Sequence, residues 1–280
     1  GLVSFNYKHC NHCIVKKHSD ESISYEHHVL EAKLVFDSFV LSIDSEFIEN
    51  PDPSVINLKK QDCEMNAFKR MAIRLKKNFP KLKFIITGDA LYASGPFIKL
   101  CLDNNWDYIF SLKSDKLQTV NRDFEGIISL ETGSTLNNYF LVKDYQYNKY
   151  TFNIVRYIED SKVFTYITNL TVDDSNIKTI IDLGRRRWKI ENQGFNVQKN
   201  ILFNINHMCS LDYNAMKAHY LFVQFAHTIR QLFDFGSSLC VTFQGKLKEI
   251  SFTILSELIS IPVNLINTNN FQLRFDNLII

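Results

Sequence analysis

Two short apolar runs constrain the fold of this chain more than any other feature. The first, Leu82–Thr87, lies between Pro80 and Gly88, and the second is Tyr108–Leu112. Apolar runs of this length are typical of strands that are buried on both faces of a sheet. The sequence over 94–104 favours a helix between them. The chain is therefore predicted to build a sheet covered by helices, as in an α/β domain.

The sequence around these runs extends the same pattern. Residues 23–36 and 39–47 are rich in β-branched and aromatic side chains and predict two strands that turn at Asp37-Ser38. Within 62–78 apolar residues recur every four positions and basic residues fill the other faces, which predicts an amphipathic helix. Three more strands are predicted between 139 and 170, and mostly helices after them.

We therefore predict a mixed α/β fold: a ribonuclease H-like core sheet flanked by helices, with a β-rich insertion and a helical C-terminal part. One strand before residue 23 would complete the core sheet. No element is predicted for the polar residues 113–138. The expected divisions are 1–112 for the first part of the core, 113–172 for the insertion, 173–236 for the core helices and 237–280 for a C-terminal helical extension.

Composition excludes several classes of protein. Thirty-two basic and 30 acidic residues give a net charge of +2, which by itself does not indicate a polyanionic partner. No apolar run approaches the roughly 18 residues that span a bilayer, so no membrane partner is expected. Six irregularly spaced cysteines do not form a disulfide framework, which favours a reducing, cytoplasmic setting.

Asp89 follows the first apolar run through the single residue Gly88. In open α/β sheets ligands gather at the carboxyl ends of strands, where loops expose side chains above a rigid base. Asp89 is therefore a candidate functional residue. The alternative is a structural aspartate that caps the following turn or helix.

Glu191 lies on a helical stripe that is otherwise apolar. The stripe consists of Ile177, Ile181, Gly184, Trp188, Glu191 and Phe195. An ionised carboxylate on a core-facing stripe is costly unless it is paired or binds a metal. The first alternative is an ion pair with Arg187, one turn earlier. The second is metal binding together with Asp89, because two divalent ions that act on a phosphate need acidic oxygens from different elements.

Several segments, in order, carry a family resemblance. Residues 185–200, read as RRRWKIENQGFNVQKN, resemble the third catalytic segment of bacterial insertion-sequence transposases of the DDE type that carry a β-rich insertion. Gly88–Ala93 resembles the second acidic segment, the sequence from Gln61 to Arg70 resembles the helix before it, and Tyr166–Leu170 resembles the strand that leads into the third segment. The resemblance covers roughly residues 1–235.

The resemblance implies that Asp89 and Glu191 are metal ligands for two Mg²⁺ or Mn²⁺ ions. It implies phosphodiester cleavage at the ends of a DNA element, followed by attack of the freed 3′-hydroxyl on target DNA. Arg187 and Lys199 are candidates for phosphate contacts, with a solvated charged face as the alternative. DNA is the expected partner, and a homodimer is compatible with this interpretation.

The family signature reads Tyr, two residues, Arg, three residues, Glu, six residues, Lys. Arg187 and Glu191 fit it, whereas Gly184 stands at the tyrosine position and Lys199 lies one place late, behind Gln198. These departures weaken any DNA contact that depends on the tyrosine.

The family also has a first catalytic aspartate at the end of the first core strand. Asp20, Asp37 and Asp44 lie in or beside later segments. We therefore expect this ligand to be absent from the 280 residues, as in an N-terminally truncated catalytic domain that cuts DNA poorly or not at all. Two other interpretations remain open: a non-catalytic DNA-binding or interaction module derived from a decayed transposase, and a ribonuclease H-like nuclease without strand transfer.

His9, Cys10, His12 and Cys13 place four potential zinc ligands within five positions, with His18, His27 and His28 nearby. A structural zinc site needs four suitably spaced ligands, and a second cysteine pair is missing. The alternatives are a zinc site and a reduced, exposed Cys/His hairpin tip.

Two other groups of residues receive structural interpretations. Asp62 and Glu64 open the basic helix, where acidic side chains favour the positive end of the helix dipole. The basic face of this helix is interpreted as solvated, with DNA contact as the alternative. A set of apolar residues between 203 and 233 is interpreted as core, with a partner-helix surface as the alternative.

Overall fold

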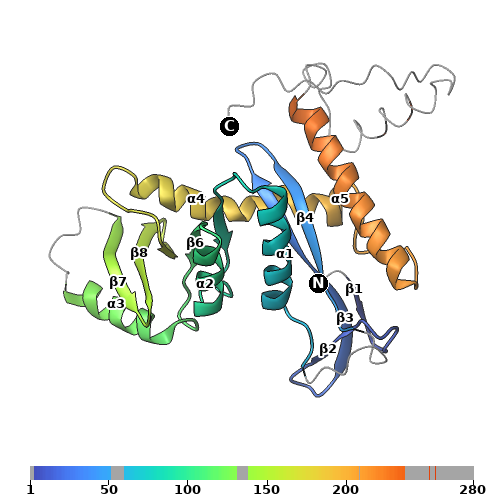
Figure 1. Ribbon diagram of the computed structural model, residues 1–280, viewed down its shortest axis with the longest axis horizontal. Helices are drawn as coiled ribbons and strands as arrows, with labels where there is room; N and C mark the ends of the chain where they lie inside the picture. Colours follow the sequence, from blue (N-terminus) through green and yellow to red (C-terminus); the bar gives the residue numbers. More distant parts are fainter. Residues whose placement is uncertain are drawn as a thin grey trace. The chain divides into compact units, whose positions relative to one another are not determined.

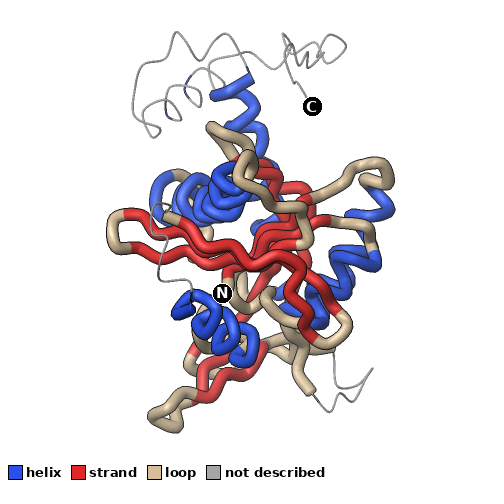
Figure 2. The backbone as a smooth tube through the Cα atoms, turned by 90° about the vertical axis from the view of Figure 1, so that its left-hand side faces the viewer, coloured by secondary structure: helices blue, strands red, loops and turns tan. Residues whose placement is uncertain are grey.

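The computed structural model describes most of the first 236 residues: 3–51, 60–130, 138–207 and 209–236, together with positions 252 and 256. Helices and strands both run through this part of the chain, as Figure 2 shows by colour. The predicted mixed α/β class is therefore confirmed. Apart from positions 252 and 256, the helical extension predicted over 237–280 lies outside the described residues.

The chain divides into two compact units. Unit 1 contains residues 1–45, 49–59 and 189–280, and unit 2 contains residues 46–48 and 60–188. Sequence from the beginning and the end of the chain therefore meets in unit 1, while unit 2 is built almost entirely from one continuous stretch.

A four-stranded sheet organises unit 1. Its strands are β1 (Val3–Phe5), β2 (Ile14–Lys17), β3 (Ile23–Val35) and β4 (Val40–Ile48), whose last three residues belong to unit 2 (Figure 1). β3 is central: β1 and β2 pair antiparallel with its first half, and β4 also pairs with it. The predicted pair of strands around Asp37-Ser38 is confirmed, and the polar pair lies in the turn between them.

The helical part of unit 1 comprises two consecutive π-helices, η1 (Ile190–Phe195) and η2 (Val197–Ile201), and the long helix α5 (Tyr213–Gly236). The prediction of an apolar core set is correct for only one face of α5. Tyr213, Met216 and Tyr220 are buried, whereas Phe222 and Phe225 are 72% and 64% exposed. Leu211 and Ile229 are also exposed. Apolar residues occur on several faces of this helix, so composition alone did not reveal which face is buried.

A five-stranded sheet organises unit 2, in the order β5-β6-β9-β8-β7. The strands are β5 (Ile85–Gly88), β6 (Asp107–Ser111), β7 (Tyr139–Tyr147), β8 (Tyr150–Glu159) and β9 (Lys162–Thr168). β5 and β6 are parallel, and the other pairs are antiparallel. The three strands predicted for the insertion therefore continue the same sheet through the β6–β9 pair.

Four helices accompany this sheet: α1 (Glu64–Asn78), α2 (Gly95–Asp103), α3 (Gln118–Leu130) and α4 (Ile177–Lys189). Helix α2 contacts β6, α3 contacts β7, and α1 contacts α2. Ile109 of β6 packs into a cluster with Ile177 and Ile181 of α4. The next residue, Phe110, points the other way, and its ring lies 5.8 Å from that of Tyr92. Tyr108, Ile109 and Phe110 are almost fully buried, so β6 is the two-sided buried strand that the sequence predicts.

One prediction for unit 2 was wrong, and one element was not predicted. β5 was expected to be buried on both faces, but it lies at an edge of the described sheet and Ile85 is 40% exposed. Burial of an apolar strand depends on its neighbours as well as on its own sequence. In addition, no element was predicted over 113–138, and α3 occupies Gln118–Leu130, with Val120 and Phe124 fully buried one turn apart.

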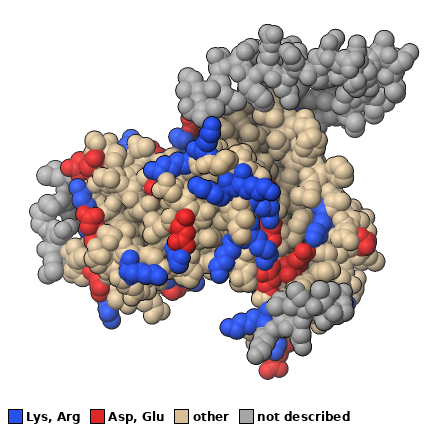
Figure 3. Space-filling model, in the orientation of Figure 1, with Lys and Arg blue, Asp and Glu red and all other residues tan. Residues whose placement is uncertain are grey.

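The surface carries both signs of charge. Figure 3 shows Lys and Arg side chains on the face in view, with Asp and Glu side chains among them. On α1, Arg70 and Arg74 both pair with Glu46, and Arg70 also pairs with Asp62. Within the described residues no helix has both the length and the apolar character to cross a membrane.

Candidate functional site

Asp89 immediately follows β5, as the sequence predicts, and its side chain is exposed. The Oδ1 atom accepts a hydrogen bond from the backbone N–H of Leu91 at 2.9 Å. Asp89 therefore caps this turn, as the structural alternative predicts, and the contact uses only one oxygen of its carboxylate. A Cβ atom on Gly88 would lie 2.6 Å from the Cβ and Cγ of Tyr92. The close turn that presents Asp89 therefore requires glycine.

A second carboxylate lies near Asp89. Glu64, in the first turn of α1, accepts a hydrogen bond from the hydroxyl of Tyr92 at 2.7 Å. Burial raises the pKa of Glu64, and the negative charge of Asp89 adds to this increase. Sequence reasoning assigned Glu64 only to the helix dipole. Its proximity to Asp89 depends on the packing of α1 against the turn after β5, which local sequence does not reveal.

Glu191 does not lie on an α-helical core stripe. Helix α4 buries Ile177, Ile181 and Gly184, as predicted, but Trp188 is 68% exposed and Glu191 is exposed as well. The reason is a change in helix type. From Ile190 onward the helix is a π-helix, in which the N–H of Asn196 donates to the carbonyl of Glu191, five residues earlier. The wider turn breaks the spacing of three or four residues on which the stripe depends.

The π-helix η1 lies close to the sheet of unit 1 at Gly194. A Cβ atom there would lie 3.2 Å from the Cε of Lys33 on β3 and 3.5 Å from the Cγ2 of Val40 on β4. This close approach fixes the segment that presents Glu191. Single-turn π-helical segments occur frequently at functional sites, so Glu191 remains a candidate for a reason different from the one the sequence offered.

Glu191 and Lys199 line the same pocket, which has a volume of about 180 Å³. The pocket lining also includes Val29, Phe195, Ile205, Asn206 and Tyr220. The Lys199 ammonium lies 5.6 Å from the centre of the Phe195 ring. Within the described residues Glu191 forms no ion pair, so ion pairing does not explain its position.

A buried polar network lies beside this pocket. Glu31 and Lys33 on β3 have fully buried side chains, with 3.8 Å between the ammonium and a carboxylate oxygen. Tyr220 donates to Glu31 at 2.9 Å, and Gln224 accepts from Lys33 at 3.1 Å. Burial raises the pKa of Glu31 and lowers the pKa of Lys33. This pair could not be predicted from the sequence, since strand alternation gives no indication that a charged residue points inward.

Arg187 lies near the end of α4 and is half-buried. Burial raises the pKa of Tyr166, and the positive charges of Arg185 and Arg187 partly offset this increase. Arg185 is engaged: it pairs with Glu159 at 2.8 Å and lies over the ring of Phe164. Arg187 forms no ion pair within the described part of the chain, so its guanidinium has no fixed anionic partner there.

Comparison with known families assigns the chain to a family. A family model described as the transposase DDE domain matches residues 56–229. The chain belongs to this family. The match spans more than half of the chain and includes Asp89, Arg187, Glu191 and Lys199. No curated protein matched the sequence.

As a DDE-domain transposase, the protein belongs to a family that acts on DNA and generally uses divalent metal ions. Both departures from the family signature coincide with close packing. Gly184, at the tyrosine position, leaves no room for a side chain, since a Cβ atom would lie 2.8 Å from the ring of Tyr166. Gln198, at the lysine position, is fully buried and donates to Gln224 and His227 at 2.7 and 2.9 Å. Lys199 reaches the pocket instead.

Proposed function

We propose that this transposase chain contributes metal and phosphate ligands to metal-dependent phosphoryl transfer on DNA. In this proposal Asp89 and Glu191 hold the divalent ions, and Arg187 and Lys199 hold phosphate groups. The observation that carries the proposal is Glu191: an exposed carboxylate without an ion pair in the described residues, lining one pocket with Lys199 inside the region matched by the family model.

The donor chemistry fits the ions that the family uses. Mg²⁺ prefers carboxylate oxygens and keeps several waters, so it needs exposed acids instead of a closed protein cage. Asp89 and Glu191 are both exposed, and Asp89 uses a single oxygen for its turn. The nearby Glu64 adds negative charge around Asp89, which favours a cation there.

Each protein group has a distinct role in the proposed reaction. The guanidinium of Arg187 donates two parallel hydrogen bonds to a phosphate, and the ammonium of Lys199 offers a point charge. Two divalent ions, Mg²⁺ or Mn²⁺, would stabilise the negative charge on the attacking and leaving oxygens. In cleavage a water oxygen bonds to phosphorus as the bond to the 3′-oxygen breaks. In strand transfer the freed 3′-hydroxyl attacks a target phosphodiester and displaces its leaving oxygen.

The resemblance requires three carboxylates, and we assign two within these 280 residues. The 280 residues by themselves are therefore expected to bind the ions weakly and to cut DNA poorly or not at all. We further propose a cytoplasmic location and a homodimer on DNA. Light scattering of the protein with and without DNA tests whether the homodimer forms.

Iron-mediated backbone cleavage tests the proposed metal ligands without relying on catalysis. Fe²⁺ replaces Mg²⁺ and, with ascorbate and peroxide, cuts the chain beside the residues that bind it. We expect cuts near both Asp89 and Glu191, suppressed by excess Mg²⁺. Asp89→Asn or Glu191→Gln should weaken both sets of cuts, since the ligands act together.

The matched control is Asp103→Asn, an exposed acid on α2 that pairs only with Lys99 in the described structure and should leave the cuts unchanged. Cuts near one residue alone would refute a shared site. Salt-dependent DNA binding in the absence of any metal-directed cuts would favour the non-catalytic module instead.

A further inference from the structure

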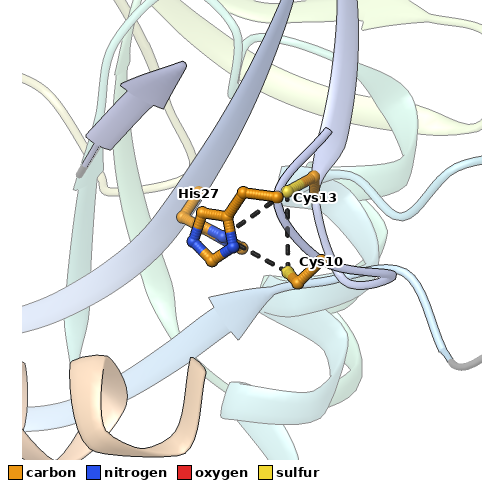
Figure 4. A group of neighbouring side chains, drawn as sticks. Cys10, Cys13 and His27 are labelled. Atoms are coloured by element: carbon orange, nitrogen blue, oxygen red, sulfur yellow. Dashed lines mark hydrogen bonds between the residues drawn. The ribbon is translucent and has the colours of Figure 1, made fainter. Parts of the chain in front are cut away.

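Four potential metal ligands gather at one end of the unit 1 sheet. His9, Cys10 and Cys13 lie in the connection between β1 and β2, and His27 lies on β3. One ligand atom from each residue lies within 4.8 Å of all the others. Figure 4 shows the side chains of Cys10, Cys13 and His27 pointing toward one another. In place of a second cysteine pair, the fold supplies His27, which the antiparallel pairing of β2 with β3 brings beside Cys13.

Three of these atoms already have the spacing of a tetrahedral metal site. The two Sγ atoms of Cys10 and Cys13 are 3.5 Å apart, and they lie 3.5 and 3.6 Å from the Nε2 of His27. Zinc–sulfur bonds of about 2.3 Å and zinc–nitrogen bonds of about 2.0 Å at tetrahedral angles place sulfurs about 3.8 Å apart and sulfur about 3.5 Å from nitrogen. The observed triangle therefore matches one face of a zinc tetrahedron.

His9 is positioned to supply the fourth ligand. Its Nε2 is buried and has no hydrogen-bond partner among the described residues. Its ring packs edge-on against Phe5 at 4.5 Å and lies 5.2 Å from the ring of His27. A buried nitrogen without a partner is costly, and coordination to a metal removes that cost.

Half of the cluster is buried and half is partly exposed, unlike the exposed hairpin tip that was the alternative interpretation: His9 and Cys10 are half-buried, and the other two ligands are buried. Cys13 and His27 are each 1% exposed. Asn50 holds the connection in place: its side-chain amide donates to the carbonyl of Cys13 at 2.8 Å, and its backbone N–H donates to the carbonyl of His12. The thiols are therefore held together by the fold before any metal binds.

His12, which the sequence grouped with these residues, is engaged elsewhere. Its Nδ1 lies 2.9 Å from the carbonyl oxygen of Asn50, and its ring stacks on Tyr213 at 4.7 Å. Tyr213, which also belongs to unit 1, stacks on the ring of His27 as well. His12 is therefore a natural control, because it is a neighbouring imidazole outside the ligand set.

We propose that His9, Cys10, Cys13 and His27 bind one Zn²⁺ ion as a structural site. Two thiolates and two imidazoles in tetrahedral geometry are a ligand set that zinc prefers, and four protein ligands leave no open position for catalysis. Binding releases the two thiol protons to solvent. The ion ties the β1–β2 connection to β3. This site is independent of the proposed catalytic ions, which need oxygen ligands.

The test uses the 280-residue protein, reduced and stripped of metal, then titrated with Zn²⁺ and, separately, with Co²⁺. Elemental analysis should give one zinc per chain. Cobalt should show the intense visible bands of a tetrahedral site with thiolate charge transfer. Cys13→Ser and His27→Ala should each weaken zinc binding at least about tenfold, whereas His12→Ala and Cys63→Ser, a change at an exposed cysteine, should leave it unchanged.

Any of three results would overturn the proposal. The first is a reduced protein that binds no zinc, the second is a cobalt complex with the weak bands of an octahedral site, and the third is an equal loss of zinc in His12→Ala and His27→Ala. A mass two hydrogens lower without reductant, with no zinc binding after reduction, would identify a Cys10–Cys13 redox pair instead. If Cys13→Ser fails to fold, the proposal still requires tetrahedral cobalt bands from the unaltered protein and weakened zinc binding in His9→Ala.

Discussion

Tyr220 on α5 donates a hydrogen bond to the Oε2 of Glu31 on β3 at 2.9 Å, joining two positions 189 residues apart. The Glu31 side chain is fully buried, and burial raises its pKa. Lys33 lies 3.8 Å from the other oxygen, and Ser45 donates to Oε2 at 2.7 Å. This contact links helix α5 to the sheet beside the pocket that contains Glu191 and Lys199.

Replacing Tyr220 with phenylalanine should lower the free energy of unfolding by about 1–3 kcal/mol, because a buried carboxylate loses one of its donors while the ring is kept. Urea denaturation measures this change. Tyr7→Phe is the matched control, since Tyr7 is 58% exposed, and it should change stability by less than about 0.5 kcal/mol. Equal effects of the two substitutions would contradict the importance of the Tyr220–Glu31 contact.

His227 should make the protein less stable in acid. Burial, with a contribution from the charge of Lys33, lowers the pKa of His227 from 6.5 to about 4. The unfolded chain therefore binds more protons between these values, so stability is complete above pH 6.5 and falls as the pH drops toward 4. The expected loss from this group is about 3 kcal/mol between pH 7 and pH 4.

Urea denaturation across this pH range isolates the contribution of His227. In His227→Asn the side-chain oxygen replaces Nδ1 as the acceptor for Gln198, and the loss of stability on acidification should shrink by that amount. His207→Asn, a change at an exposed histidine, should keep the full loss. An unchanged pH profile in His227→Asn would show that His227 does not titrate as its burial requires.

The parts of the fold that the sequence predicted are those set by local periodicity. Strands β3 and β4, helix α1 and the buried strand β6 follow from residue spacing and turn residues. Helix α3 was missed although Val120 and Phe124 are one turn apart, because polar residues and Gly126 obscured the pattern. The edge position of β5 was missed because it depends on which strands pair, and local sequence does not contain that information.

The candidate sites show the same limit. Asp89 is a candidate because a strand and a glycine precede it, and the structure places it directly after β5. Glu191 became a candidate from a helical stripe that the structure does not contain, because a stripe assumes bonds between residues four apart and the π-helix changes that spacing. His27 completes the Cys/His cluster from another strand, 14 positions from Cys13. Strand register brings it there, and the register emerges only when the sheet is formed.

Gly184 should tolerate a side chain poorly, because α4 approaches β6 and β9 closely at this position. In Gly184→Ala the Cβ atom would lie 2.8 Å from the Tyr166 ring and 3.1 Å from Ile109, both of them buried. We expect a loss of about 1–3 kcal/mol in the free energy of unfolding.

Gly126→Ala on α3 is the matched control for this substitution. A Cβ atom there meets nothing within 4 Å among the described residues, and alanine favours helix, so stability should rise by roughly 0.5–1 kcal/mol. Urea denaturation of both variants measures the difference. A stabilised Gly184→Ala protein would contradict the packing of α4 against β6 and β9.

The two tryptophans test where the α-helical stripe ends. Trp106 is 1% exposed and Trp188 is 68% exposed. Trp106→Ala should cost about 3–5 kcal/mol of stability, whereas Trp188→Ala should change it by less than about 0.5 kcal/mol. Iodide should quench the fluorescence of Trp188 preferentially, so Trp188→Phe should remove most of the quenchable emission. A cost at Trp188 close to that at Trp106 would mean that the stripe continues unbroken, and Glu191 would then face the core as the sequence suggested.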